Sequence, residues 1–267
     1  MKINKYVKVV ISLLCIILIT VNIYFVLKII NEKNNKDDIE NSKMESMKDS
    51  EVNIEVENVI KDNGENIVKV LLNEDFYYEA ITDKIKARIN GISYKENDKI
   101  NYDELRYVTV KYYNFNHEIQ SGELIVNVCV ADDVLEIFKE LYDNEYEIEK
   151  IRLIDDYNGN DDASMADNNS SAFNFRNIDG TEEISDHSYG VAIDINPLYN
   201  PYVRQGFGDR DVLPVNGVAY ADRESEFAHK IVKGDVCYQA FINRGWKWGG
   251  DWDSPKDYQH FYKEIAK

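Results

Sequence analysis

Residues 185–197 read SDHSYGVAIDINP, and this stretch constrains the fold most because it places a carboxylate within an apolar strand. Side chains alternate between the two faces of a strand. One face would hold Val191, Ile193 and Ile195, and the other Ala192, Asp194 and Asn196. The first face is expected to be core. A carboxylate on the second face is costly to bury unless a positive group lies opposite it. The sequence therefore predicts a compensating partner for Asp194.

His187, one of only four histidines, precedes Asp194 by seven residues. An odd spacing would point the two side chains to opposite faces of a straight strand. Gly190 lies between them and offers a bend or bulge that could return His187 to the Asp194 side. Taken alone, such a histidine is more often a hydrogen-bonded structural residue than a metal ligand.

The segment GWKWGGDWDSPKDYQHFY near the C-terminus adds Asp257 and His260, three residues apart. If this segment turns once, the two side chains point the same way. Two histidines and an aspartate are a ligand set for catalytic zinc that leaves a fourth position for water. Zinc lowers the pKa of bound water to ~7. A carboxylate close to that water but not on the metal can transfer its proton, and Asp257 is a candidate for this role.

With these motifs the sequence resembles the zinc peptidases that cut bacterial cell-wall peptides. This family comprises D-Ala-D-Ala carboxypeptidases and L-alanyl-D-glutamate endopeptidases, which share a fold with the hedgehog signalling domain. Its pattern S-x-H-x-x-G-x-A-x-D, then W-G-G-x-W, then D/E-x-x-H, is matched by Ser185, His187, Gly190, Ala192 and Asp194, by WGGDW, and by Asp257 with His260. The similarity extends over roughly residues 75–267.

The resemblance implies zinc bound by His187, Asp194 and His260, with Asp257 as general base. It also implies that Arg176, in DDASMADNNSSAFNFR, grips a substrate carboxylate or the developing oxyanion. Ser185, Tyr189 and Trp252 are further candidates for substrate contact, although Trp246, Trp248 and Trp252 are equally compatible with core positions. The aspartate in DYQHF resembles the endopeptidase branch and favours cleavage between L-Ala and D-Glu. A D-Ala-D-Ala carboxypeptidase is the alternative.

The pattern of elements predicts an α+β domain with a mainly antiparallel sheet flanked by helices. Strands are expected in LRYVTVKYYNF, GELIVNVCV, EIEKIRLI and YGVAIDIN, and helices in FYYEAITDKIKARING, ADDVLEIFKELYDNEY and DVCYQAFINRG. In the second of these helices, Asp132 or Asp133 is expected to provide the N-cap. A net charge of −18 argues against a nucleic-acid partner.

The N-terminus predicts a membrane anchor. Residues 9–27 carry no charge and follow Lys2, Lys5 and Lys8. Nineteen helical residues nearly span a bilayer, and the lysines predict a cytoplasmic N-terminus. We therefore expect a tail and single-pass transmembrane helix over residues 1–30, a flexible polar spacer over 31–64, and an extracellular peptidase domain over 65–267. Cys129 and Cys237 are expected to be buried free thiols.

The leading hypothesis is thus a membrane-anchored zinc peptidase that acts on peptidoglycan peptides. Two alternatives remain open: a catalytically silent zinc domain that binds cell-wall peptides, and a structural ectodomain whose histidines never meet. The acidic loop DDYNGNDDASMADNN departs from the EF-hand pattern at Asp161 and Asp167, so calcium is disfavoured there.

Overall fold

The computed structural model of the protein describes residues 55–62 and 65–265. The apolar segment 9–27 lies outside these residues, and no helix among those described is long and apolar enough to span a bilayer. Residues 55–62 form a strand rather than part of a spacer, so folded structure begins before residue 65.

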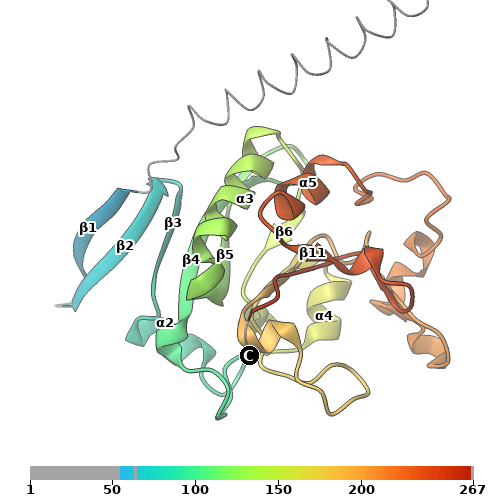
Figure 1. Ribbon diagram of the computed structural model, residues 1–267, viewed down its shortest axis with the longest axis horizontal. Coiled ribbons are helices and arrows are strands. Elements are labelled where there is room, and N and C mark those ends of the chain that lie inside the picture. Colours follow the sequence, from blue (N-terminus) through green and yellow to red (C-terminus); the bar gives the residue numbers. More distant parts are fainter. Residues whose placement is uncertain (1–54, 63–64, 266–267) are drawn as a thin grey trace, which may run out of the picture. The chain divides into compact units, whose positions relative to one another are not determined.

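The sheet with the most strands among the described residues is five-stranded and antiparallel, in the order β1-β2-β3-β4-β5 (Figure 1). Its strands are β1 (Glu55–Asp62), β2 (Glu65–Asn73), β3 (Phe76–Ala80), β4 (Leu105–Tyr113) and β5 (Ile119–Asn127). The α-helices are α2 (Asp83–Ile89), α3 (Ala131–Asp143), α4 (Asp161–Ala166) and α5 (Val236–Ile242). The α+β architecture expected from the sequence is confirmed.

Three small sheets complete the fold. They have the strand orders β10-β9-β12, β11-β13-β8 and β6-β7. Their strands are β6 (Lys150–Ile151), β7 (Asn169–Ser170), β8 (Ala192–Asp194), β9 (Tyr202–Val203), β10 (Val212–Leu213), β11 (Lys247–Trp248), β12 (Lys256–Asp257) and β13 (His260–Tyr262). A short 3-10 helix, η4 (Asp186–Tyr189), precedes β8. All pairings except β6–β7 are antiparallel.

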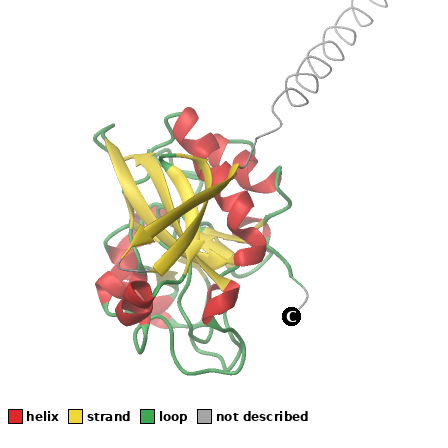
Figure 2. Ribbon diagram, turned by 90° about the vertical axis from the view of Figure 1, so that its left-hand side faces the viewer, coloured by secondary structure: helices red, strands yellow, loops and turns green. Residues whose placement is uncertain are grey.

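Both faces of the large sheet are covered around β4 and β5, and Figure 2 shows helices on either side of it. On one face, Val108, Leu124 and Val126 pack with the apolar stripe of α3 and with β8. On the other, Leu105 and Ile125 pack with the buried residues of α2. This alternation follows the two-residue period of the strands, and it ties β8 to the main core.

Two local predictions were wrong. The segment expected to be one helix over FYYEAITDKIKARING begins as β3, in which Phe76 and Tyr78 are buried, and becomes helical only after Thr82 caps α2. Aromatic residues favour strands, so the early half pairs with β4 instead. The N-cap of α3 is Val130 and not an aspartate. Asp132 instead accepts a hydrogen bond from the Tyr78 hydroxyl, and Asp133 accepts one from Trp246 Nε1.

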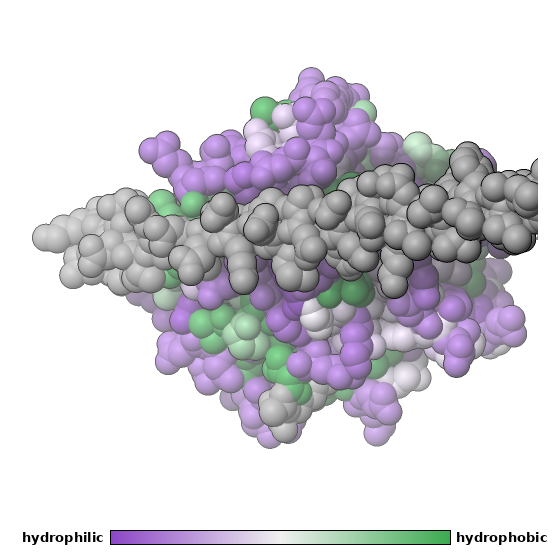
Figure 3. All heavy atoms as spheres, turned by 45° about the horizontal axis from the view of Figure 1, so that its top comes forward, coloured by the Kyte–Doolittle hydropathy of each residue, from purple (hydrophilic) through white to green (hydrophobic). Residues whose placement is uncertain are grey.

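Cys129 and Cys237 are free, as expected, but Cys129 is exposed and only Cys237 of this pair is buried. The face shown in Figure 3 is mostly hydrophilic, with small separate hydrophobic patches, as the acidic composition suggests.

Candidate metal centre and active site

Strands β8 and β13 bring two of the expected ligands together. In their antiparallel register, Asp194 lies directly opposite His260, although 66 residues separate them in the sequence. Facing residues of paired strands have Cβ atoms ~4.5–5.5 Å apart, so their side chains on one face meet. The Nδ1 atom of His260 lies 3.1 Å from Oδ1 of Asp194, and both residues are buried.

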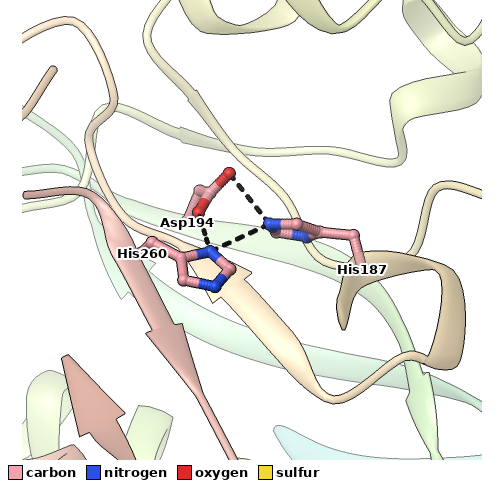
Figure 4. Close-up of side chains that lie close together, drawn as sticks. All are labelled: His187, Asp194 and His260. Atoms are coloured by element: carbon pink, nitrogen blue, oxygen red, sulfur yellow. Dashed lines mark hydrogen bonds and ion pairs between the residues drawn. The ribbon is translucent and has the colours of Figure 1, made fainter. Parts of the chain in front are cut away.

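His187 reaches the same point from η4, because the chain reverses at Gly190. That glycine has φ +69°, a left-handed conformation that favours glycine. A Cβ there would lie 2.6 Å from the Asn127 backbone nitrogen. The expected bend at Gly190 is confirmed, and Nε2 of His187 lies 3.2 Å from Oδ2 of Asp194 and 3.2 Å from Nδ1 of His260 (Figure 4).

The hydrogen bonding of His187 shows why this cluster suits a cation. Its Nδ1 donates to the Ala172 carbonyl oxygen at 2.5 Å, since a carbonyl can only accept. In the neutral ring Nε2 therefore carries a lone pair, which faces an acceptor oxygen of Asp194 and a nitrogen of His260. Burial opposes charge on the ring, but the carboxylate of Asp194 outweighs it and raises the pKa of His187. Burial likewise opposes ionisation of Asp194, yet the two histidines hold the pKa of its carboxyl well below the usual range.

A divalent metal ion fits the three donor atoms, one from each residue. In a tetrahedral site with bonds of ~2.0–2.1 Å, neighbouring ligand atoms are ~3.3 Å apart. Here His187 Nε2 lies 3.2 Å from His260 Nδ1, while His260 Nδ1 lies 3.1 Å from Oδ1 of Asp194 and His187 Nε2 lies 3.2 Å from its Oδ2. Each histidine thus meets a different oxygen of the carboxylate, and one ligand atom from each residue lies within 4.8 Å of the others. The Ala172 carbonyl would orient His187, as outer hydrogen bonds do at metal sites. His187, Asp194 and His260, predicted as ligands, are thus brought together.

A cavity of about 320 Å³ opens beside the three ligand residues. Arg176, Ser185, Trp252 and Asp257, all predicted site residues, line it. Other lining residues include Asp161, Asp179, Asp186, Tyr202, Arg204 and Gln259. This volume, with a wall that combines apolar area and a few charged side chains, suits a short peptide segment rather than a large folded partner.

Asp257 stands in β12, opposite Tyr202 of β9. It is therefore not joined to His260 by a helical turn, because the chain passes from one small sheet to another between them. Its Oδ1 is buried without a hydrogen-bond partner. Burial raises the pKa of Asp257 to about 7, with the charge of Asp194 adding to the effect and His260 and Arg176 opposing it. Such a carboxylate, close to a reacting water, is suited to proton transfer.

The WGGDW motif packs closely against the backbone of Asp257. A Cβ on Gly249 would lie 2.7 Å from the Asp257 carbonyl oxygen and 2.8 Å from its Cβ, so only glycine leaves room. Trp248 is buried in the core and donates from Nε1 to the Tyr258 carbonyl. The motif thus packs the back of β12 at this point.

Arg176 and Ser185 are held beside η4. The Arg176 guanidinium binds Oδ2 of Asp161 at 2.6 Å, and its Nε is buried without a partner. Ser185 caps η4 by accepting from the His187 backbone nitrogen at 3.3 Å. Ser185 therefore helps to position His187 as well as bordering the cavity.

Of the remaining aromatic residues considered for substrate contact, only Trp252 lies at the cavity. Trp252 lines the cavity, with its ring centre 5.6 Å from that of His260. Trp246 and Trp248 belong to the core. Tyr189 packs against the same core and is not among the residues that line the cavity.

Sequence reasoning missed several residues of the cavity wall. Asp161 lies in the acidic loop that was considered only for calcium, and its partner Arg176 was the available signal. Arg204 and Asp179 carry no motif, and only the folded chain places them in the wall.

Comparison with known proteins gives one family. A family model described as D-alanyl-D-alanine carboxypeptidase matches residues 179–263, a range that contains the three ligand residues and Asp257. No curated protein and no solved structure matches the chain.

Proposed function

We propose that the chain is a zinc peptidase that hydrolyses peptidoglycan stem peptides, starting from the match of residues 179–263 to the family model described as D-alanyl-D-alanine carboxypeptidase. The observation that carries the proposal is the buried cluster of His187, Asp194 and His260, with one ligand atom from each within 4.8 Å of the others, beside a cavity that Asp257 also lines. A silent binding domain would have no need of a buried carboxylate poised for proton transfer.

The reaction is hydrolysis of an amide. A metal ion held by the three ligands would supply Lewis acidity, which activates water and polarises the scissile carbonyl. Asp257 accepts a proton from the attacking water as the oxygen–carbon bond forms, and delivers it to the leaving nitrogen as the carbon–nitrogen bond breaks. Arg176, in the cavity wall, binds a substrate carboxylate or the developing oxyanion.

Two scissile bonds are compatible with this site. The aspartate at position 257 favours the L-alanyl-D-glutamate endopeptidase branch. The description of the matching family favours the D-Ala-D-Ala bond. Both bonds occur in one stem pentapeptide, so a single substrate distinguishes them.

We also propose that residues 9–27 anchor the chain in the cell membrane and that the peptidase domain faces outward. The uncharged run after three lysines supports this topology. Accessibility of the domain to protease added outside intact cells tests it, and protection of the domain would refute it.

The test of activity is digestion of muropeptides by the zinc-loaded full-length chain, with new termini identified by mass spectrometry. Asp257→Asn should lower the cleavage rate ~100-fold or more while the zinc content stays at one per chain. Asp253→Asn is the matched control, since Asp253 is exposed in the same segment and is absent from the cavity lining. Absence of cleavage with zinc bound, or full activity of Asp257→Asn, would refute the proposal.

A further inference from the structure

Arg204 is a charged side chain almost entirely enclosed in the cavity wall. It follows β9 and is 6 % exposed, yet it lines the same cavity as the metal ligands. Among the residues of that lining, only Arg176 and Arg204 carry a permanent positive charge. Arg176 already has a role in the proposed reaction, whereas Arg204 has none.

The guanidinium of Arg204 is held in one orientation by its surroundings. Its Nε donates to the Arg210 carbonyl oxygen at 3.0 Å, and its plane lies over the Phe207 ring at 3.7 Å from the ring centre. A planar, fixed guanidinium offers its remaining N–H groups as a fork that matches a carboxylate.

Both terminal nitrogens of the fork bind Asp179, one through its carboxylate and the other through its backbone carbonyl oxygen at 3.4 Å. Oδ2 of Asp179 lies 2.5 Å from an Arg204 terminal nitrogen, and this contact lowers the pKa of Asp179. Asp179 lies in the turn in which the Ile178 backbone nitrogen donates to the Glu183 carbonyl. Its side chain is 48 % exposed, whereas that of Arg204 is 5 % exposed. The arginine therefore needs a counter-ion, but the aspartate remains solvated without one.

Asp179 also has a second cation within reach. Arg210 lies 3.5 Å from the same Oδ2 and forms two hydrogen bonds with Asp162. If another anion took its place at Arg204, Asp179 would keep a positively charged neighbour. Exchange of one carboxylate for another at Arg204 thus leaves no buried charge unpaired.

We propose that Arg204 is a specificity-determining residue that binds a carboxylate of the peptide substrate, and that Asp179 occupies this position in the absence of substrate. The inference rests on the proposed peptidase function and specifies its substrate class as acidic peptides. A peptide with a carboxamide at that position cannot replace the charge of Asp179 and is bound more weakly.

The test uses the pentapeptide L-Ala-γ-D-Glu-L-Lys-D-Ala-D-Ala with the zinc-loaded full-length chain. Two derivatives are compared with it, one amidated at the D-Glu α-carboxylate and one at the C-terminus. Cleavage is measured as kcat/KM, and binding by calorimetry. The unmodified peptide should be preferred over one of the two amides by about 10- to 100-fold, the range for a hydrogen-bonded ion pair.

Two variants separate recognition from a structural role. Arg204→Gln should abolish the preference for the carboxylate, so that kcat/KM and affinity for the unmodified peptide fall to those for the amide. Asp179→Asn should strengthen binding of the unmodified peptide several-fold, because it removes the internal competitor, whereas a purely structural ion pair predicts weaker binding. Arg88→Gln is the matched control, since Arg88 pairs with Glu123 and Asp156 away from the cavity lining.

The outcomes of the two proposals can be told apart. If the wild-type chain cleaves none of the peptides, the proposed function fails, but the binding measurement still tests Arg204. Equal affinity for all three peptides, or an Arg204→Gln variant that loses the same factor on each of them, would overturn the inference.

Discussion

Replacing Gly190 with alanine should damage both the fold and the metal centre. At φ +69° an L-residue costs about 1–2 kcal/mol relative to glycine. The added Cβ would also lie 2.6 Å from the Asn127 nitrogen and 3.0 Å from the Val126 carbonyl carbon. These are backbone atoms of β5 and its end, so they cannot rotate away, and η4 must move off the sheet.

Such a movement would break or lengthen two hydrogen bonds between β5 and η4. The Asn127 backbone nitrogen donates to the Gly190 carbonyl at 2.8 Å, and the Asn127 side chain donates to the Tyr189 carbonyl at 3.1 Å. Each contributes roughly 1 kcal/mol. Together with the backbone strain, the free energy of unfolding should fall by about 3–4 kcal/mol. Because His187 moves with η4, zinc affinity should fall as well.

The assay is urea unfolding of the full-length chain, with and without zinc, alongside Gly91→Ala. Gly91 has φ +79°, but nothing lies within 4 Å of a Cβ placed there. This control therefore carries only the backbone strain of about 1–2 kcal/mol. Equal losses for the two variants, or unchanged zinc affinity in Gly190→Ala, would show that the close approach to β5 does not position His187.

Three further predictions concern the same region. When free zinc is near 1,000 times its Kd, removing it with a chelator should lower the Tm by about 10 °C. His260→Ala should show no Tm difference with and without the chelator. A chelator effect that persists in this variant would contradict His260 as a ligand. In the metal-free chain, Asp257 has a folded-state pKa of about 7 against an ordinary 3.8, so the native state holds the extra proton and stability falls as pH rises between these values. Asp257→Asn should reduce that loss by ~2–4 kcal/mol in pH-dependent unfolding, and an unaltered pH profile would argue against the buried carboxyl. Trp246→Phe should lower the free energy of unfolding by about 1–3 kcal/mol, because core volume and a hydrogen bond to Asp133 are lost. Trp252→Phe should lower it by under about 1 kcal/mol but weaken peptide binding, because Trp252 lines the cavity. Urea unfolding and binding calorimetry measure the two effects, and a larger loss of stability in Trp252→Phe would contradict the assignment of Trp246 to the core and Trp252 to the cavity.

The ligand set could be predicted from the sequence because each ligand type stands in a motif with its own chemical reason. Asp194 interrupts an apolar strand, and Gly190 permits the reversal that brings His187 back. The long helix α3 was also predictable, since its buried residues recur at helical spacing. Apart from His260, which entered the ligand set through a second motif and the family resemblance, these features depend on neighbours within about ten residues.

Features that depend on distant contacts could not be predicted. The register that places Asp194 opposite His260 is a property of two paired strands, and no local pattern encodes it. Asp132 and Asp133 do not cap α3 because the 3-10 turn of residues Val128–Val130 leads directly into the helix and places both aspartates inside its first turn, where Tyr78 and Trp246 bind them. The ion pair of Arg204 with Asp179 joins two loops in the same way.

The pairing of β8 with β13 has a consequence for how this protein can vary. Asp194 and His260 face the metal centre, while the neighbouring pair, Ile193 and Phe261, is fully buried in the main core. A core substitution that alters the packing of Ile193 or Phe261 would therefore shift the ligand residues next to them in the strands. Substitutions in this part of the interior should therefore be limited by their effect on the ligand positions as much as by their effect on stability.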